Sequence, residues 1–316
     1  MAHPFRFGVQ IGDLPAASWQ QDVQRMEEQG YSTVFLPDHF SKQWDPTTAL
    51  AGLAAVTERL NVGSLVYDVD YRHPVVFAKA AATLHLMSGG RHEFGIGAGW
   101  METDYVEAGM PYDRPGVRIS RLDEALQVIL SMWENKRTSF EGEHYTIREI
   151  ARAANLGDAG RPRILIGGGG PRLLKLAGRY ADIVGINPKM VEGKITAETP
   201  ADSAPERVRQ KVAWVREGAE AAGRNPDDIE FNSLTFVTAF VDDPSGLRAS
   251  IGKNSGMTAE QVADCPLFLT GSANEIRETL HKRREETGIS YVVIQGGDEA
   301  VLETFAKEVV QPLAGK

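Results

Sequence analysis

The chain has 316 residues, of which 42% are hydrophobic and 24% charged, the proportions of an ordinary globular protein. Its net charge of −9 argues against a nucleic acid or an anionic membrane as partner, because both require a basic surface. The single cysteine, Cys265, excludes an internal disulfide framework and indicates a reducing compartment. With neither a signal-peptide pattern nor an apolar run of about 18 residues, the chain is predicted to be cytoplasmic.

Strand and helix patterns alternate along the first half of the chain. The helix predicted from residue 45 begins with Asp45 as N-cap and Pro46 at the first helical position, a favoured order. Strands are predicted at residues 5–11, 61–67 and 91–99 and within 32–40, where the strand is followed by a loop; helices are predicted at 18–30, 45–60, 74–90 and 117–136.

The alternation continues through the second half. Two Ser-x-x-Glu capping boxes, at Ser203 and Ser272, predict the starts of two helices. Strands are predicted at residues 163–170, 181–186, 229–241 and 289–294, and helices at 171–180, 203–223, 272–288 and the C-terminus.

Eight strands that alternate with helices favour a closed (β/α)8 TIM barrel, with residues 1–316 as a single domain. A doubly wound open sheet is the structural alternative. Two segments do not fit the simple alternation. Residues 138–147 alternate like a short hairpin, and residues 187–204 form a longer excursion. Long segments of this kind are commonly insertions or lids.

Four consecutive glycines, Gly167, Gly168, Gly169 and Gly170, lie between a predicted strand and a helix that begins with Pro171. Helix N-termini carry unpaired N–H donors and a positive partial charge, so a phosphate binds well there. The alternative is a tight turn, which needs only one or two glycines. The sequence therefore predicts an anion site, in which replacing Gly169 by Asp should block binding without disturbing the fold.

A second glycine cluster, at residues 95–100, has the spacing Gly-x-Gly-x-Gly rather than that of a dinucleotide fingerprint. It is a weak Rossmann signal. It is a plausible strand end where the backbone of Gly97, Ala98 and Gly99 lies flat against a ring system.

An acid and an imidazole, Asp38 and His39, follow the second predicted strand. Active sites of such barrels lie at the carboxyl ends of the strands, and histidine is the natural proton donor or acceptor near neutral pH. A surface histidine on a loop is the alternative. His73, directly before Pro74, is compatible with a simple helix cap. No pair of histidines with a carboxylate has metal-ligand spacing, so no metal is predicted. Cys265 is predicted to be inert.

The stretches YSTVFLPDHF, YRHPVVFAKAAATLHLMSGGRHEFGIGAGW, ILIGGGGPRLLKLAGRYADIV and GSANEIRETLHKRREETGISYVVI together resemble the bacterial luciferase-like superfamily. Within it they are similar to the actinobacterial oxidoreductases that use the deazaflavin coenzyme F420. The resemblance covers essentially the whole chain. It is less specific for the cofactor, because sister branches use FMN.

The resemblance implies a role for each matching segment. Asp38 and His39 would contact the deazaflavin ring, with His39 in proton transfer. A non-prolyl cis-peptide bulge within Ser64, Leu65, Val66 and Tyr67 would support the ring. The second glycine cluster would lie along the cofactor, and the glycine run with Arg172 would bind its phosphate. A homodimer is also expected.

One position departs from the sugar-phosphate dehydrogenase branch of the family. That branch has a Glu directly after the second glycine cluster, where this chain has Trp100. A glucose-6-phosphate-type activity is therefore disfavoured. We expect a substrate pocket lined by Trp100, Trp44 and Asn187. Because F420 is strongly anionic, basic side chains are expected at the barrel mouth; the candidates are Arg72, Arg172, Lys175, Lys189 and Lys194.

The sequence thus predicts an F420-dependent oxidoreductase that transfers a hydride to or from a C=C, C=O or C=N bond of a small molecule. An FMN-dependent monooxygenase on the same fold is the first alternative. A cofactor-binding protein without turnover is the second. An isomerase or lyase acting on a phosphorylated substrate is disfavoured, because no strand end offers a paired Lys or Glu base.

Overall fold

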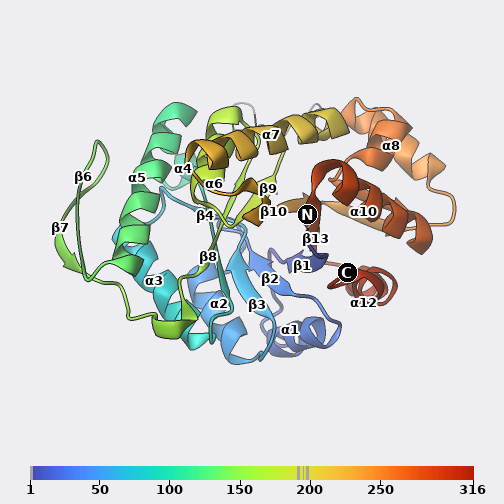
Figure 1. Cartoon of the computed structure of the whole chain (residues 1–316). Coiled ribbons are helices and arrows are strands. Elements are labelled where there is room, and N and C mark those ends of the chain that lie inside the picture. The colour runs from blue at the N-terminus through green and yellow to red at the C-terminus, as the bar shows by residue number, and fades with distance from the viewer. Residues whose placement is uncertain (1–2, 191–192, 195, 197–198) are drawn as a thin grey trace.

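The computed structural model describes residues 3–190, 193–194, 196 and 199–316. Its centre is a closed barrel of parallel strands surrounded by helices (Figure 1). The barrel strands are β1 (Arg6–Gln10), β2 (Thr33–Leu36), β3 (Asn61–Ser64) with its extension β4 (Tyr67–Asp68), β5 (His92–Gly97), β8 (Arg163–Gly168), β9 (Ile183–Ile186), β10 (Glu230–Thr235) and β13 (Ile289–Gln295). Pairing of Val62 with His92 joins β3 to β5 and closes the ring, so the predicted (β/α)8 barrel is confirmed and the open sheet is wrong.

Helices cover the outside of the barrel (Figure 1). They are α1 (Trp19–Glu28), α2 (Pro46–Ala55), α3 (Pro74–Met87), α5 (Pro115–Glu134), α6 (Pro171–Tyr180), α7 (Pro205–Ala221), α10 (Ala273–Thr287) and α11 (Glu299–Phe305), which continues through a π-helical turn into α12 (Gln311–Leu313). The predicted caps at Asp45 and Ser272 are confirmed, because both side chains accept a backbone N–H of the first helical turn. No helix among the described residues is long and apolar enough to span a membrane.

The predicted capping box at Ser203 is wrong. Helix α7 begins at Pro205 with Ala204 as its N-cap, and no side chain caps it. Ser203 is instead buried in a 3₁₀ turn, Thr199–Ser203. A proline at the first helical position removes one unpaired N–H donor, so this helix can begin without a side-chain cap.

The strand predicted at residues 229–241 is two strands that belong to different sheets. β10 ends at Thr235, which lies opposite Ile294 near the end of β13. Beyond Phe236 the chain leaves the barrel as β11 (Val237–Phe240), which pairs in parallel with β12 (Phe268–Gly271). Helices α8 (Ser245–Ser255) and α9 (Ala259–Asp264) connect these two strands; they and β12 are missing from the prediction.

The predicted hairpin at residues 138–147 is confirmed as an antiparallel pair. Its strands, β6 (Arg137–Glu141) and β7 (Thr146–Ala151), extend beside α5 and away from the barrel (Figure 1). A further short helix, α4 (Glu102–Glu107), follows β5 and lies outside the simple strand–helix alternation.

Two separate hydrophobic clusters lie on the two sides of the barrel wall. Along β8, Ile164 and Ile166 belong to the larger cluster, whereas Leu165 between them belongs to the smaller one. Because side chains alternate across a strand, the smaller cluster fills the barrel interior. Its buried members are Phe35, Leu65, Leu165, Ile183, Tyr291 and Val293.

A charged network fills the amino-terminal end of that interior. The Arg6 guanidinium from β1 pairs with Glu93 of β5 and donates to Glu230 of β10 at 2.8 Å. It lies 4.2 Å from the ring centroid of Tyr291, whose hydroxyl donates to Glu93. Both carboxylates are at most 3% exposed, so Arg6 compensates two buried negative charges.

We predict that Arg6→Met lowers the free energy of unfolding by about 3 kcal/mol or more, because it leaves buried carboxylates without their cation. Arg163→Met is the matched control, since Arg163 also pairs with Glu230 but its side chain is 43% exposed. The measurement is urea unfolding of both variants. Equal losses in the two would contradict a special role for Arg6.

Candidate functional site

The third barrel strand is interrupted at the carboxyl-terminal mouth by a cis peptide bond between Leu65 and Val66. This is the non-prolyl cis bond that the resemblance implies for residues 64–67. Hydrogen bonds hold both sides of it: the Ser64 hydroxyl donates to Gly95 O at 2.6 Å, and the Gln10 amide donates to Leu65 O at 2.8 Å. Tyr67 then resumes the strand and is buried.

The glycines at the end of β5 are required by the protein's own neighbours. A Cβ on Gly97 would lie 2.8 Å from the Val66 side chain. Gly99 has φ of +68°, and a Cβ there would lie 2.0 Å from the Tyr105 hydroxyl. Between them, the Ala98 carbonyl accepts a hydrogen bond from Arg118 at 3.0 Å. These contacts fix the backbone of residues 97–99 at the mouth, where the sequence predicted a cofactor-contacting strand end.

His39 lies at the mouth with one ring nitrogen engaged. Its Nδ1 is 2.6 Å from Asp104 Oδ2, and the same oxygen accepts a hydrogen bond from Tyr71 at 3.1 Å. The indole of Trp100 stands edge-on to the imidazole, with centroids 5.7 Å apart. The structure therefore brings the predicted proton-transfer residue and one predicted pocket residue together. His39 Nε2 has no hydrogen-bonding partner among the described residues.

The neighbouring Asp38 is engaged by the protein itself. Arg72 donates to both carboxylate oxygens, at 2.6 and 3.1 Å, and also to Asp45 at 2.8 Å. Asp38 Oδ2 further accepts the backbone N–H of Asp68 at 3.1 Å. The Asp38 carboxylate is buried. Partial burial of the Arg72 guanidinium acts to lower its pKa, but the carboxylates of Asp38 and Asp45 outweigh this and raise the pKa above its ordinary value. Asp38 thus ties the second strand end to the third.

The four-glycine run spans the end of β8 and the start of α6, and its glycines differ in surroundings. A Cβ on Gly169 would lie 2.4 Å from the backbone N of Lys189, so the predicted fold-neutral Gly169→Asp change would displace residues 187–189. A Cβ on Gly170, the N-cap of α6, would meet nothing within 4 Å. Gly170 is therefore the position of the glycine run at which a side chain could be added without a clash.

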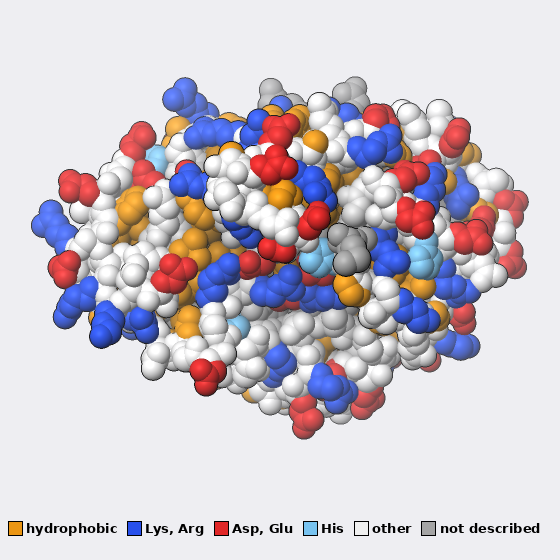
Figure 2. All heavy atoms as spheres, viewed as in Figure 1, with side chains coloured by type: hydrophobic (Ala, Val, Ile, Leu, Met, Phe, Trp, Pro, Cys, Tyr) orange, Lys and Arg blue, Asp and Glu red, His pale blue; other side chains and the backbone are white. Residues whose placement is uncertain are grey.

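Arg172 does not extend over the glycine run. Its guanidinium donates to Gly116 O and to the Ser120 hydroxyl, each at 2.8 Å, and so joins α6 to α5. Two other predicted mouth cations are also paired within the protein: Lys175 with Glu217 and Lys194 with Glu102. Acidic and basic side chains are interspersed in the same way over the face that Figure 2 shows.

The segment of residues 187–204 starts at the mouth and extends to the residues that follow β5. A Cβ on Gly193 would lie 2.7 Å from Trp100 O, so the excursion touches the segment after β5. The fully buried Lys211 ammonium holds both ends of this segment, because it donates hydrogen bonds to the Asn187 carbonyl and to the Asp202 carboxylate. Residues 191–192, 195 and 197–198 of the excursion lie outside the described part of the chain.

The two remaining predicted pocket residues have different surroundings. The Asn187 amide lies over the glycine run, 3.0 Å from where a Cβ of Gly167 would stand. Trp44 packs edge-on against Trp19, with ring centroids 6.3 Å apart, and contacts the outer core. Among the described residues, no ring contact joins Trp44 to His39 or Trp100.

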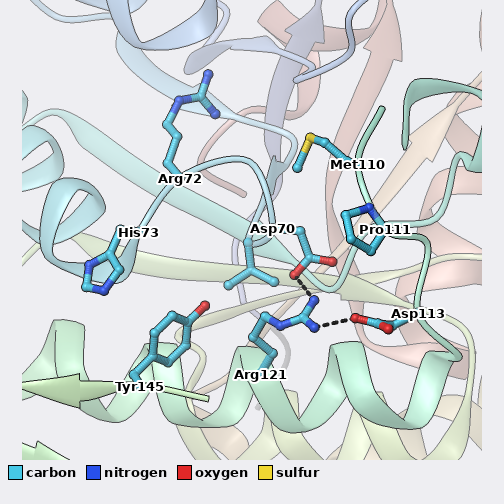
Figure 3. A pocket seen from close by; sticks show the side chains of 9 residues that line it. Asp70, Arg72, His73, Met110, Pro111, Asp113, Arg121 and Tyr145 are labelled. Atoms are coloured by element: carbon cyan, nitrogen blue, oxygen red, sulfur yellow. Dashed lines mark hydrogen bonds and ion pairs between the residues drawn. The ribbon is translucent and has the colours of Figure 1, made fainter. Parts of the chain in front are cut away.

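A cavity of about 370 Å³ lies beside the Arg72–Asp38 pair, between the loop after β4, the segment before α5 and the β6–β7 hairpin. Figure 3 shows Arg121 of α5 between Asp70 and Asp113, with Tyr145 of the hairpin beside it. The cavity shares Arg72 with the network around Asp38 but contains none of the predicted glycines. Its cations are already paired with carboxylates, so we do not place the catalytic centre there.

Sequence reasoning missed Asp104 and Tyr105, which lie on α4. The Tyr105 hydroxyl donates to Asp68 at 2.7 Å and contacts Asp70 at 2.9 Å, which fixes this helix against the loop after β4. The only signal in the sequence was that these two residues follow shortly after the glycines at the end of β5. Among the described residues, no group of three or more His, Cys, Asp or Glu side chains suits a metal ion.

Burial raises the pKa of the Asp68 carboxyl to about 7, and the nearby Asp70 and Asp38 carboxylates add to the shift. Hydrogen bonds from the Asp70 N–H and the Tyr105 hydroxyl oppose it. A carboxyl group in an unfolded chain titrates near pH 4, so the folded protein holds this proton more tightly.

We predict that the stabilising contribution of protonated Asp68 is full below about pH 4 and is lost as the pH rises through about 7. Asp68→Asn should therefore gain stability relative to the native chain by up to about 1.4 kcal/mol per pH unit across that window. Urea unfolding of both proteins from pH 4 to 8 measures this difference. A difference independent of pH would show that Asp68 is not the titrating group.

Comparison with known proteins agrees with the geometry. A family model described as luciferase-like monooxygenase matches residues 2–251. An F420-dependent glucose-6-phosphate dehydrogenase of Microbacterium testaceum is 32% identical, over 79% of this chain and 73% of that protein. A phthiodiolone/phenolphthiodiolone dimycocerosates ketoreductase of Mycobacterium tuberculosis is 30% identical, over 94% of this chain and 79% of that protein.

Two solved structures share the fold at lower identity. The coenzyme F420-dependent tetrahydromethanopterin reductase from Methanopyrus kandleri superposes with a TM-score of 0.77 at 20% identity, covering 98% of this chain and 99% of that one. An F420-dependent secondary alcohol dehydrogenase, solved with an F420–acetone adduct, gives 0.78 at 18% identity and 98% coverage of both chains. The family match and the 30–32% identical relatives together show that this chain belongs to the luciferase-like monooxygenase family.

Proposed function

We propose that this protein is an F420-dependent oxidoreductase that transfers a hydride between the deazaflavin C5 and a C=C, C=O or C=N bond of a small organic substrate. Relatives at 30–32% identity are named for F420 dependence, and the proteins of similar fold include two F420-dependent reductases or dehydrogenases. The observation that carries the catalytic part of the proposal is the imidazole of His39 at the mouth, with Nε2 unengaged among the described residues.

The residues at the mouth fit a planar ring with an anionic tail. Glycines at the ends of β5, β8 and β9 leave the upper interior without side chains, at Gly97, Gly167 and Gly185. The Leu65–Val66 bulge lies next to Gly97, on the neighbouring strand. Gly170 opens the N-terminus of α6, where unpaired N–H donors suit a phosphate. These residues would hold the cofactor.

When bound, the deazaflavin would supply or accept the hydride. The protein must then supply or remove the accompanying proton, and we assign this task to His39 Nε2. Asp38 acts as a positioning residue, because its carboxylate holds Arg72 and the start of β4 rather than pointing freely into the mouth.

The substrate is proposed to be a small molecule without a phosphate group. Trp100 places an apolar edge against His39, at the position where the resemblance leads us to expect a glutamate in sugar-phosphate dehydrogenases. Arg72, Lys175 and Lys194, which could otherwise recognise a second phosphate, are paired with carboxylates. A carbonyl or an activated alkene fits these surroundings better.

An FMN-dependent monooxygenase is the second candidate, because the family is described by that activity and a monooxygenase from Streptomyces bottropensis shares the fold with a TM-score of 0.75. A cofactor-binding protein without turnover is the third. Binding of F420 with no hydride exchange against any ketone, enone or imine tested would favour it.

Two further proposals accompany this function. A homodimer is expected, and α3 carries apolar side chains suited to such an interface: Val76 is 52% exposed and Met87 is 65% exposed.

We also propose a cytoplasmic location. The one cysteine, Cys265, is buried, and burial raises the pKa of its thiol to about 11, which fits an unreactive core residue.

We predict that the protein binds F420 more tightly than FMN, and that Gly170→Asp weakens F420 binding at least about tenfold by placing a carboxylate near the phosphate. Gly170 has an extended backbone, with φ of −97° and ψ of 151°, and aspartate is a favoured N-cap. The variant should therefore fold. Isothermal titration with F420 and with FMN gives the affinities.

Gly170→Asn is the control, because it has nearly the same volume and capping ability without the charge. It should retain most of the F420 affinity. If both variants bind F420 as the native chain does, the phosphate lies elsewhere; tight FMN binding without F420 binding would move the protein to the flavin branch.

We predict that His39→Gln lowers turnover roughly 10²–10⁴-fold and leaves F420 affinity nearly unchanged, as expected for loss of a general acid or base. Turnover is followed by the absorbance of F420 during reaction with a panel of ketones, enones and imines. His73→Gln is the control, since His73 caps α3 by accepting the Val75 N–H and packs against Tyr145 of the hairpin rather than against His39. Full turnover in the His39 variant would assign the proton to another group.

A further inference from the structure

We propose that Asp104 is the positioning residue for His39: its carboxylate holds the Nδ1–H tautomer and so leaves Nε2 as the nitrogen that exchanges a proton with substrate. This inference rests on the proposed function, in which His39 is the proton-transfer group. The observation that carries it is the 2.6 Å contact between His39 Nδ1 and Asp104 Oδ2.

The hydrogen bond has one chemically consistent direction when Asp104 is ionised. A carboxylate only accepts hydrogen bonds, and a neutral imidazole has one donor and one acceptor nitrogen. Nδ1 must therefore carry the proton, and Nε2 must be the lone-pair nitrogen of the neutral ring. A carboxylate that fixes the tautomer and orientation of a catalytic imidazole in this way is a general device in enzymes.

Asp104 is held rigidly enough to orient another side chain. It is 4% exposed, and Tyr71 donates a second hydrogen bond to the same oxygen that receives His39. The adjacent Tyr105 is fully buried and anchors α4 through Asp68 and Asp70. Asp104 therefore cannot follow His39 freely, and the imidazole adopts the direction that Asp104 imposes.

No permanent cation competes for this carboxylate among the described residues. Arg72 is directed to Asp38 and Asp45, and Arg121 to Asp70 and Asp113. The basic side chain that contacts Asp104 is the His39 imidazole, which is charged only when protonated. A buried carboxylate without an arginine or lysine needs hydrogen-bond donors, and the imidazole N–H supplies one of the two that the structure shows.

The alternative is that Asp104 serves only the packing of α4 and Tyr71. The two roles differ in what they predict for the imidazole. A purely structural carboxylate leaves the tautomer of His39 to solvent, where Nε2–H is also populated. A positioning carboxylate keeps the proton on Nδ1.

The deciding experiment is NMR of the full chain labelled with ¹⁵N-histidine, without cofactor or substrate, at a pH at which the His39 ring is neutral in the spectrum. Loss of signals in His39→Gln identifies the residue. We expect the Nδ1–H tautomer in the native chain and in Glu107→Gln, a matched change of an exposed acid on the same helix. An Nε2–H tautomer in the native chain overturns the proposal.

Variants at residue 104 test the cause. Asp104→Leu removes the acceptor and should shift the ring toward the Nε2–H tautomer, whereas Tyr71→Phe keeps the carboxylate and should not. If Asp104→Leu fails to fold, Asp104→Asn, which is nearly isosteric, should shift the ring partly. An unchanged tautomer in a folded residue-104 variant also overturns the proposal.

A double-mutant cycle gives a second readout with F420 and any substrate that the panel identifies. Asp104→Asn should lower kcat about 10–100-fold in the native background, the usual effect of removing a group that orients a functional histidine. It should have almost no effect in the His39→Gln background, and F420 affinity should stay unchanged in both. Additive losses overturn the positioning role.

The outcomes separate the two proposals. If His39→Gln has full turnover, or F420 does not bind, the proposed function fails while the tautomer measurement still decides the Asp104–His39 pairing. If His39→Gln is inactive but the residue-104 variants have native tautomer and turnover, the function stands and the positioning role fails.

Discussion

The closed barrel has one interior, and this chain uses its two ends in opposite ways. At the amino-terminal end, Arg6 spans the interior and neutralises Glu93 and Glu230, which come from strands that are not neighbours of β1. An ion-pair network with almost no exposed carboxylate must be complete, because a missing cation leaves buried negative charge.

At the carboxyl-terminal end, three interior positions of the barrel carry no side chain. Gly97, Gly167 and Gly185 come from three different strands, and the Leu65–Val66 bulge comes from a fourth. The protein's own packing favours glycine at Gly97, where an added Cβ would lie 2.8 Å from the Val66 side chain; a Cβ on Gly167 would lie 3.0 Å from the Asn187 amide. Under the proposed function, the same absence of side chains would leave room for a flat ring.

Charge at the mouth is organised in pairs rather than as a basic patch. Arg72 is divided between Asp38 and Asp45, and Arg121 between Asp70 and Asp113. In a chain of net charge −9, this pairing neutralises both arginines, whereas the predicted mouth cation Lys189 is exposed and has no ion pair among the described residues. An anionic cofactor would then rely on backbone N–H donors at the start of α6 more than on side-chain cations. His39 and Asp104 stand apart from these arginines, which leaves the imidazole with a carboxylate partner of its own.

The sequence by itself determined the barrel, because strand and helix periodicities and the caps at Asp45 and Ser272 are local features. It also pointed to the glycine run and to His39, since each follows a predicted strand and parallel strands end at one face. Residues 64–67 were indicated by the family resemblance. Only the tertiary structure decided that residues 229–241 divide between two sheets, because the ladder with β13 ends there. Only the tertiary structure paired Arg72 with Asp38, turned Arg172 toward α5 and brought Asp104 to His39 from 65 residues away. Contacts of this kind depend on how separate loops meet above the barrel, and no local pattern in the chain encodes that meeting.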